Sequence, residues 1–103
     1  MANREVKLKM SPDLSLKAIR ALVEKKQGWT IRSFKPEEGM VAARTPASIL
    51  SWGEDITIRV KASTEGSLVG IESNPAAQIF DWGRSASNVA ALATEIAALQ
   101  VSA

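Results

Sequence analysis

The sequence contains no cysteine, no histidine and no tyrosine. Without cysteine, the chain can form neither a disulfide nor a thiolate metal site. The absence of histidine removes the side chain that most often serves as general acid or base, and cysteine is missing as a nucleophile. These absences exclude the commonest kinds of active site. We therefore expect a protein that is not an enzyme and that needs no cofactor.

Carboxylates are the main ligands left for a metal ion. Two adjacent pairs stand out, Glu37-Glu38 in a predicted turn and Glu54-Asp55 at the start of a predicted strand. Neither pair has the spacing of a calcium-binding loop, and the chain has no glycine-rich phosphate-binding loop. The sequence therefore predicts no metal site.

Long apolar runs are also absent, because no stretch approaches the roughly 18 residues of a membrane span. The opening residues, MANREVKLKM, lack the apolar segment of a signal peptide. We therefore expect a cytoplasmic protein. The 103 residues suffice for one small domain, which we expect to occupy positions 1–103.

The charge balance gives a weaker signal than the isoelectric point of about 9.2 suggests, since the net charge is only +2. Almost nothing in this chain titrates between carboxylates near ~4 and lysines near ~10, so a small positive excess raises the isoelectric point. The placement of the basic residues therefore matters more than their number.

Hydrophobic periodicity predicts five strands and two helices. Alternation of apolar and polar residues predicts strands at 4–10, 29–34, 39–45, 54–62 and 67–73. Ser11 or Asp13 can cap the first helix, and Gly28 suits its end. The second helix carries one apolar stripe, formed by Val89, Leu92, Ile96 and Leu99.

The predicted order is strand, helix, four strands, helix. Short turns between consecutive strands indicate an antiparallel sheet, and two helices with apolar stripes need one face of it. We therefore predict an α+β two-layer sandwich, with both helices on one face of the sheet. The order resembles the TATA-binding-protein-like topology and, more loosely, the helix-grip lipid-binding domains, but likeness of fold assigns no function.

One stretch also resembles a known family. The segments DITIRV and VGIES, followed by Asp81-Trp82-Gly83 at the start of a helix, are similar to the bacterial family called domain of unknown function 1499. The resemblance covers roughly residues 41–99. It implies the same fold, and it implies no activity, because none is established for that family.

The motif Asp81, Trp82 and Gly83 is best explained as a joint between the sheet and the last helix. The Asp81 carboxylate can accept hydrogen bonds from backbone N–H groups of the first turn and cap the helix. Gly83 allows a sharp turn that packs Trp82 back on the sheet. We therefore expect a structural role for this motif.

The sheet face away from the helices is predicted to be basic. If the helices cover the side of Val6, Ile31 and Ile58, the other side carries Glu5 and Glu72 together with six basic residues: Lys7, Lys9, Arg32, Arg44, Arg59 and Lys61. These groups either bind nucleic acid or simply solvate the open side of the sheet. Because Phe34 is the one stacking candidate among them, we expect only weak, salt-sensitive nucleic-acid binding.

The segment 48–53 places Ile49, Leu50 and Trp52 in a predicted loop. Large apolar side chains in a loop either fold over one end of the core or contact a partner or an apolar ligand. The sequence thus predicts a small non-enzymatic interaction or binding module, whose partner is an unknown protein or a small apolar ligand. The alternatives are a binder of apolar small molecules or lipid between the sheet and the last helix, and a weak nucleic-acid binder.

Overall fold

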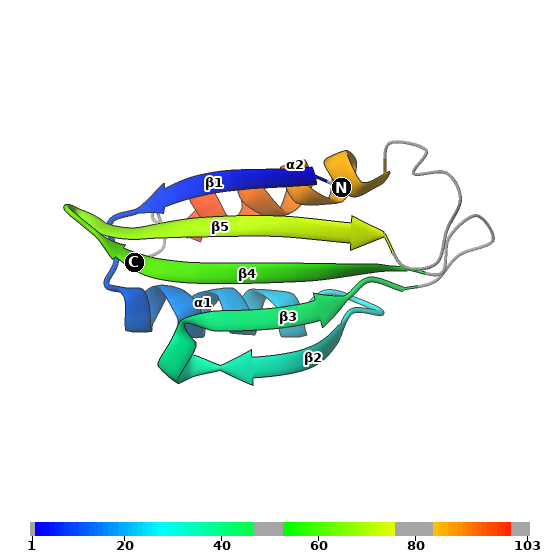
Figure 1. Cartoon of the computed structure of the whole chain (residues 1–103), viewed down its shortest axis with the longest axis horizontal. Coiled ribbons are helices and arrows are strands. Elements are labelled where there is room, and N and C mark those ends of the chain that lie inside the picture. The colour runs from blue at the N-terminus through cyan, green and yellow to red at the C-terminus, as the bar shows by residue number, and fades with distance from the viewer. Residues whose placement is uncertain (1, 47–52, 76–83, 100–103) are drawn as a thin grey trace.

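The computed structural model describes residues 2–46, 53–75 and 84–99. Within these ranges the elements occur in the predicted order (Figure 1). They are β1 (Ala2–Leu8), α1 (Pro12–Glu24), β2 (Thr30–Lys35), the 3-10 helix η1 (Pro36–Glu38), β3 (Met40–Arg44), β4 (Glu54–Ser63), β5 (Gly66–Pro75) and α2 (Arg84–Ala97). The predicted α+β fold class is confirmed.

The five strands form one antiparallel sheet in the order β1-β5-β4-β3-β2. β4 is central, and β4 and β5 form a hairpin in which Ser63 pairs with Gly66. Ile56, Ile58 and Val60 alternate with more exposed residues, and all three are buried. The predicted central strand and its hairpin with β5 are thus confirmed.

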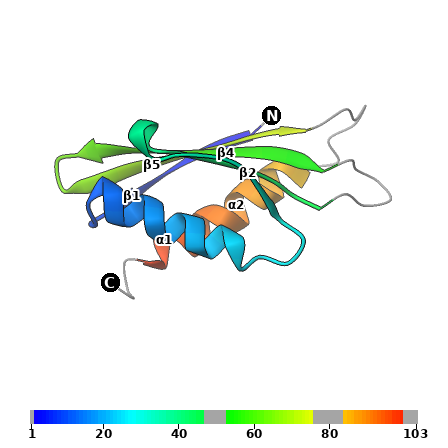
Figure 2. The ribbon, with the colours of Figure 1, turned by 90° about the horizontal axis from the view of Figure 1, so that it is seen from below.

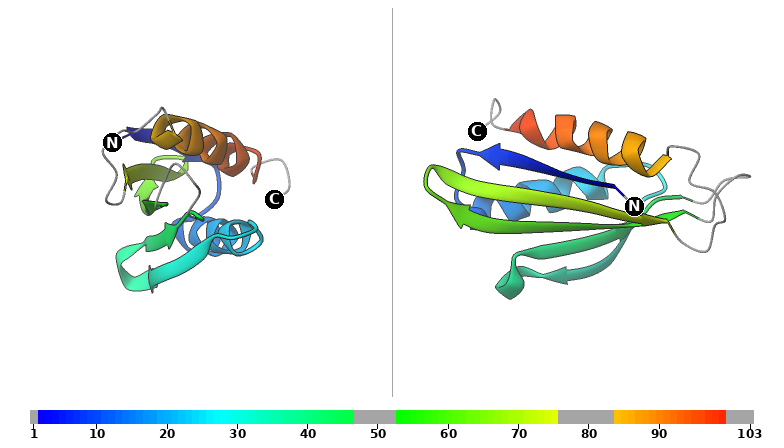
Figure 3. Two further views of the ribbon diagram at one scale, coloured as in Figure 1. Left: turned by 90° about the vertical axis from the view of Figure 1, so that its right-hand side faces the viewer. Right: turned by 45° about the horizontal axis from the view of Figure 1, so that its top comes forward.

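Both helices cover the same face of the sheet (Figure 2). α1 packs across β2, β3, β4 and β5, whereas α2 packs mainly against β1 and also against β5 (Figure 3). The α1 residues Leu16, Ile19 and Val23 and the α2 residues Val89, Leu92 and Ile96 are buried against the inner residues of the sheet. This two-layer core results directly from the apolar stripes of the two helices.

Local signals fix α1 in its place. Ser11 is its N-cap, and the Ser11 hydroxyl accepts a hydrogen bond from the N–H of Leu14 at 3.3 Å. Beyond its last turn, Gly28 has a left-handed φ of 82°. Lys26 Nζ then lies 2.8 Å from Glu95 Oε1 of α2, which ties the two helices together.

The predicted strand bounds differ from the observed ones by one or two residues, and two of the differences matter for the site. β1 ends at Leu8 rather than Met10, and the Met10 carbonyl instead accepts a hydrogen bond from the Ser67 hydroxyl at 2.7 Å. In β2 the register shifts between Ile31 and Ser33, so one extra residue lies between them. This bulge moves Phe34 to the helix-covered face, and the prediction that Phe34 lies among the open-face charges is wrong.

Phe34 packs against the core from that side. Its ring centroid lies 4.3 Å from the Arg20 guanidinium carbon of α1, a cation–π contact. The aromatic ring is therefore occupied by the protein's own cation, on the side of the sheet that faces the helices.

Candidate functional site

Two groups of predicted site residues lie outside the described residues: Ile49, Leu50 and Trp52 of the apolar loop, and Asp81, Trp82 and Gly83 of the helix-start motif. Their roles stay predictions. The basic residues, in contrast, are all described.

The register of the strands defines the sheet face opposite the helices, which we call the open face (Figure 1). Four of the six predicted basic residues lie on it: Lys7, Arg44, Arg59 and Lys61. Arg32 is the extra residue of the β2 bulge, and Lys9 lies beyond the end of β1. Lys35 of β2, which the sequence pattern left out, also lies on this face opposite Met40, so the face carries five basic residues.

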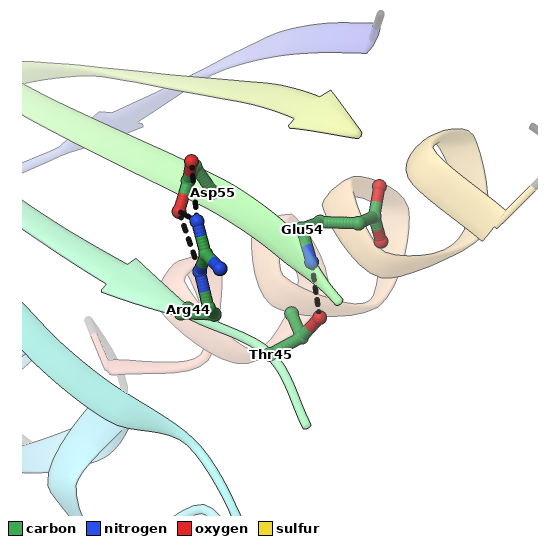
Figure 4. Close-up of polar contacts among 4 residues, drawn as sticks. All are labelled: Arg44, Thr45, Glu54 and Asp55. Carbon is green, nitrogen blue, oxygen red and sulfur yellow. Dashed lines mark hydrogen bonds and ion pairs between the residues drawn. The ribbon is translucent and has the colours of Figure 1, made fainter. Parts of the chain in front are cut away.

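An acidic residue that the sequence pattern left out of this face neutralises Arg44. Arg44 Nε and Nη2 donate to Asp55 Oδ1 and Oδ2, both at 3.0 Å, in a two-pronged pair (Figure 4). Asp55 joins Glu5 and Glu72 as a third carboxylate on the open face. The charges on this face are therefore mixed in sign.

The open face has a hollow at its centre. Glu5, Gly70 and Arg59 lie side by side on three neighbouring strands, and Gly70 contributes no side chain. The hollow has a volume of about 560 Å³, and its other open-face lining residues are Asn3, Thr57 and Glu72. A Cβ atom added to Gly70 would meet only the Arg59 carbonyl oxygen, at 4.0 Å, so the space above this glycine is open.

Opposite charges face each other across that hollow without pairing. Glu5 and Arg59 are both exposed. Within the described part of the chain, neither side chain makes an ion pair or a hydrogen bond. The two charges are thus available to a binding partner, which makes this hollow our leading candidate site.

The sequence pattern did not reveal a second polar feature, the buried carboxylate of Glu54. Glu54 begins β4 and is 1% exposed. Its side chain points toward α2, whereas Asp55 points to the open face (Figure 4). Glu54 Oε2 accepts a hydrogen bond from the Ser73 hydroxyl at 2.7 Å, and Oε1 accepts one from the Asn88 amide of α2.

Backbone contacts hold Glu54 from the other side. Its N–H donates to Thr45 Oγ1 at 2.9 Å, and the Thr45 N–H donates to its carbonyl at 3.0 Å. Glu54 thereby connects the ends of β3 and β5 with the first half of α2. A signal for its burial was present, because Glu54 is in phase with the buried Ile56, Ile58 and Val60. We interpret it as a structural group.

The interface between the sheet and α2 is filled by side chains where the structure describes it. Val89, Leu92 and Ile96 are at most 1% exposed and belong to the continuous core. Within the described ranges, no group of three or more acidic residues could hold a metal ion. No helix there is long and apolar enough to cross a membrane.

Comparison with known proteins finds a similar fold but no similar sequence. No family model matches the chain, and no curated protein matches its sequence. Among solved structures, the crystal structure of Ara h 8.0201 is similar, with a TM-score of 0.60 over 99% of this chain and 97% of that chain. The two sequences are 10% identical, so this likeness shows the α+β fold and carries no function.

Proposed function

We propose that the chain is a small non-enzymatic interaction module that binds a partner through its open face. The hollow at Gly70, with Arg59 and Glu5 on its two sides, lies at the centre of the contact. This hollow is the observation that carries the proposal, because it provides both a recess and charged groups that the described chain itself does not use.

The architecture supports the same conclusion. The helices bury one face of the sheet and leave the other uncovered (Figure 2). The regular strands supply a rigid, extended surface, whereas an active site needs converging acid, base or nucleophile groups. The resemblance of residues 41–99 to domain of unknown function 1499, and a cytoplasmic location, are part of this proposal.

Site-specific photocrosslinking in living cells tests it. A photoreactive amino acid is placed at position 57, on the open face beside the hollow, and in a second variant at position 94, on the exposed side of α2. We expect a discrete crosslinked product from position 57 and none from position 94. Addition of Gly70→Val should remove the product, because the valine side chain occupies the open space above this glycine.

A product that persists in Gly70→Val, or that forms equally from position 94, would contradict the proposal. The alternative of an apolar ligand between the sheet and α2 has a separate test. Lipids and small apolar molecules should raise the melting temperature of the purified protein if that alternative holds. The filled interface of α2 makes us place the partner on the open face instead.

A further inference from the structure

The charges on the open face form a pattern along the strands. Because consecutive same-face residues are two positions apart, the register divides this face into four rows that run across the sheet. From the β4 start toward the β4–β5 hairpin, the rows are Thr30, Arg44, Asp55 and Asn74; then Ser33, Ala42, Thr57, Glu72 and Asn3; then Lys35, Met40, Arg59, Gly70 and Glu5; then Lys61, Leu68 and Lys7.

Lys61 and Lys7 lie in the last row and Lys35 in the third, whereas the two acidic side chains on β4 and β5 lie in the first two rows. Asp55 of the first row and Lys61 of the last row lie on the same strand, β4. Glu72 of the second row and Gly70 of the third row likewise share β5. The charge on this face thus changes sign along the central strand β4, from Asp55 to Arg59 and Lys61.

A surface of this kind is complementary to itself. Consider two copies whose open faces meet, related by a two-fold axis that lies in the plane between the sheets and runs at right angles to the strands. Each strand then faces the same strand of the other copy, and the order of the rows is reversed: the first row faces the last, and the second faces the third. Asp55 then faces the partner's Lys61, and Glu72 faces the hollow at the partner's Gly70. No like charges are placed directly opposite each other.

We infer that the partner of the open face is a second copy of this chain, arranged about that two-fold axis. This inference rests on the proposed function, because it names the partner of the same surface. In the dimer, Glu72 enters the hollow of the other copy and leans toward the partner's Arg59. Thr57 also meets the partner's Arg59, and Asn3 meets the partner's Glu5.

The size of the face suits such a dimer. Ten residues of β4 extend about 33 Å and five strands span about 24 Å, so the face covers at most about 800 Å². A standard specific interface buries about 800 Å² per partner. Two sheets in face-to-face contact also pack with their strands within about 30° of each other, which keeps the facing rows in reach.

The polar composition sets the expected strength. Leu68 and Met40 are the only large apolar side chains in the four rows, so charge pairs carry the contact. We expect a dissociation constant in the range of about 10–100 μM at physiological salt. Salt should weaken the dimer, because exposed charge pairs are screened.

Analytical ultracentrifugation of the purified chain tests the arrangement with paired charge reversals. Alone, Arg59→Glu places two acidic groups opposite the partner's Glu72, and Glu72→Lys places a lysine opposite the partner's Arg59. Arg59→Glu should self-associate at least about tenfold more weakly than the parent, the equivalent of ~1.4 kcal/mol. Glu72→Lys should lose less, because its lysine also lies near the partner's Glu5. An equimolar mixture should recover the dimer, because both contacts in the mixed pair join opposite charges.

Three further variants sharpen the test. Gly70→Val should weaken the dimer by filling the recess, whereas Leu14→Ser on the exposed side of α1 should leave it unchanged. Glu5→Gln should strengthen it, because Glu5 repels the incoming carboxylate of the partner. Circular dichroism confirms that each variant is folded.

The inference would be overturned if the parent protein stays monomeric up to about 1 mM, because its dissociation constant would then exceed that value. A dimer that the Arg59 and Glu72 reversals leave unchanged would also overturn the inference, because such a dimer would use another surface. If the parent is monomeric and the crosslinker at position 57 captures a different protein, the inference of self-association is wrong and the proposed function is supported. If the parent is monomeric and position 57 gives no crosslinked product, both the inferred dimer and the proposed function are wrong.

Discussion

At the scale of single residues, Glu54 and Asp55 show how adjacent carboxylates take different roles. They are neighbours in sequence and point to opposite faces of the sheet (Figure 4). Asp55 is about half exposed and pairs with Arg44, whereas Glu54 is buried and accepts hydrogen bonds from β5 and α2. A buried polar group is stable only when it is hydrogen-bonded. The two residues should therefore differ sharply in what their loss costs.

We predict that Glu54→Ala lowers the free energy of unfolding by about 1–3 kcal/mol or more, because Ser73 and Asn88 lose their acceptor inside the protein. Asp55→Ala, the matched control, should cost less than about 1 kcal/mol, since its ion pair with Arg44 is exposed to solvent. Urea denaturation of both variants measures the difference. Equal losses for the two variants would contradict the structural role assigned to Glu54.

Glycines at two positions should respond in opposite ways to the same substitution. Gly39 has a φ of 65°, and a Cβ there would lie 2.3 Å from the Val60 carbonyl oxygen. Gly70 has open space. We predict that Gly39→Ala destabilises the protein by more than about 1 kcal/mol, and that Gly70→Ala stabilises it by up to about 1 kcal/mol. Thermal unfolding separates the two outcomes, and a loss of stability in Gly70→Ala would show that the hollow is not open.

At the scale of secondary-structure elements, β4 should be the most protected strand. It lies between β3 and β5, so its amides meet a neighbouring strand on either side. We predict that the amides of Ile56, Ile58 and Val60 are among the slowest in hydrogen exchange, and that β2, at the edge of the sheet, exchanges faster. Exchange followed by nuclear magnetic resonance checks this order. Faster exchange in β4 than in β2 would contradict the sheet order.

The elements themselves were predictable because each carries a simple period. Alternation located β4, and the apolar stripe located α2, since both patterns report burial against one face. The bulge in β2 was not visible, because no residue near Arg32 signals an extra position, and a shift of one residue turned Phe34 to the other face. Glu54 was missed for a different reason: a carboxylate at a core position is recognised only when its donors, Ser73 and Asn88, are known to be near.

The candidate site was therefore predictable only in part. The sequence pattern placed Arg59, Lys61, Lys7 and Arg44 on one side of the sheet, and the structure agrees. It did not reveal the hollow, which depends on Gly70 standing between Glu5 and Arg59 on neighbouring strands. That arrangement is set by the strand order, since β1 pairs with β5 across a long stretch of sequence.

At the scale of the whole molecule, the charges on the open face determine how strongly the chain binds nucleic acid. Of the basic residues on it, Arg44 is already paired with Asp55, and the other four are Lys7, Lys35, Arg59 and Lys61. Three carboxylates share the face, and Phe34 lies on its far side. Tight binding to a phosphate backbone needs a longer row of positively charged residues, and sequence specificity needs groups that stack on the bases or hydrogen-bond to them.

We predict a dissociation constant weaker than about 10 μM for a duplex of about 20 base pairs at physiological salt. Because at most four cations contact phosphates, the logarithm of affinity should fall with the logarithm of salt concentration with a slope no steeper than about −4. Fluorescence anisotropy titrations at several salt concentrations measure both quantities, and Lys61→Ala should reduce the slope by about 0.9. Submicromolar binding with a preference for one sequence would show that the open face reads bases, and it would also compete with the self-association of the chain, because both would need Arg59 and Lys61.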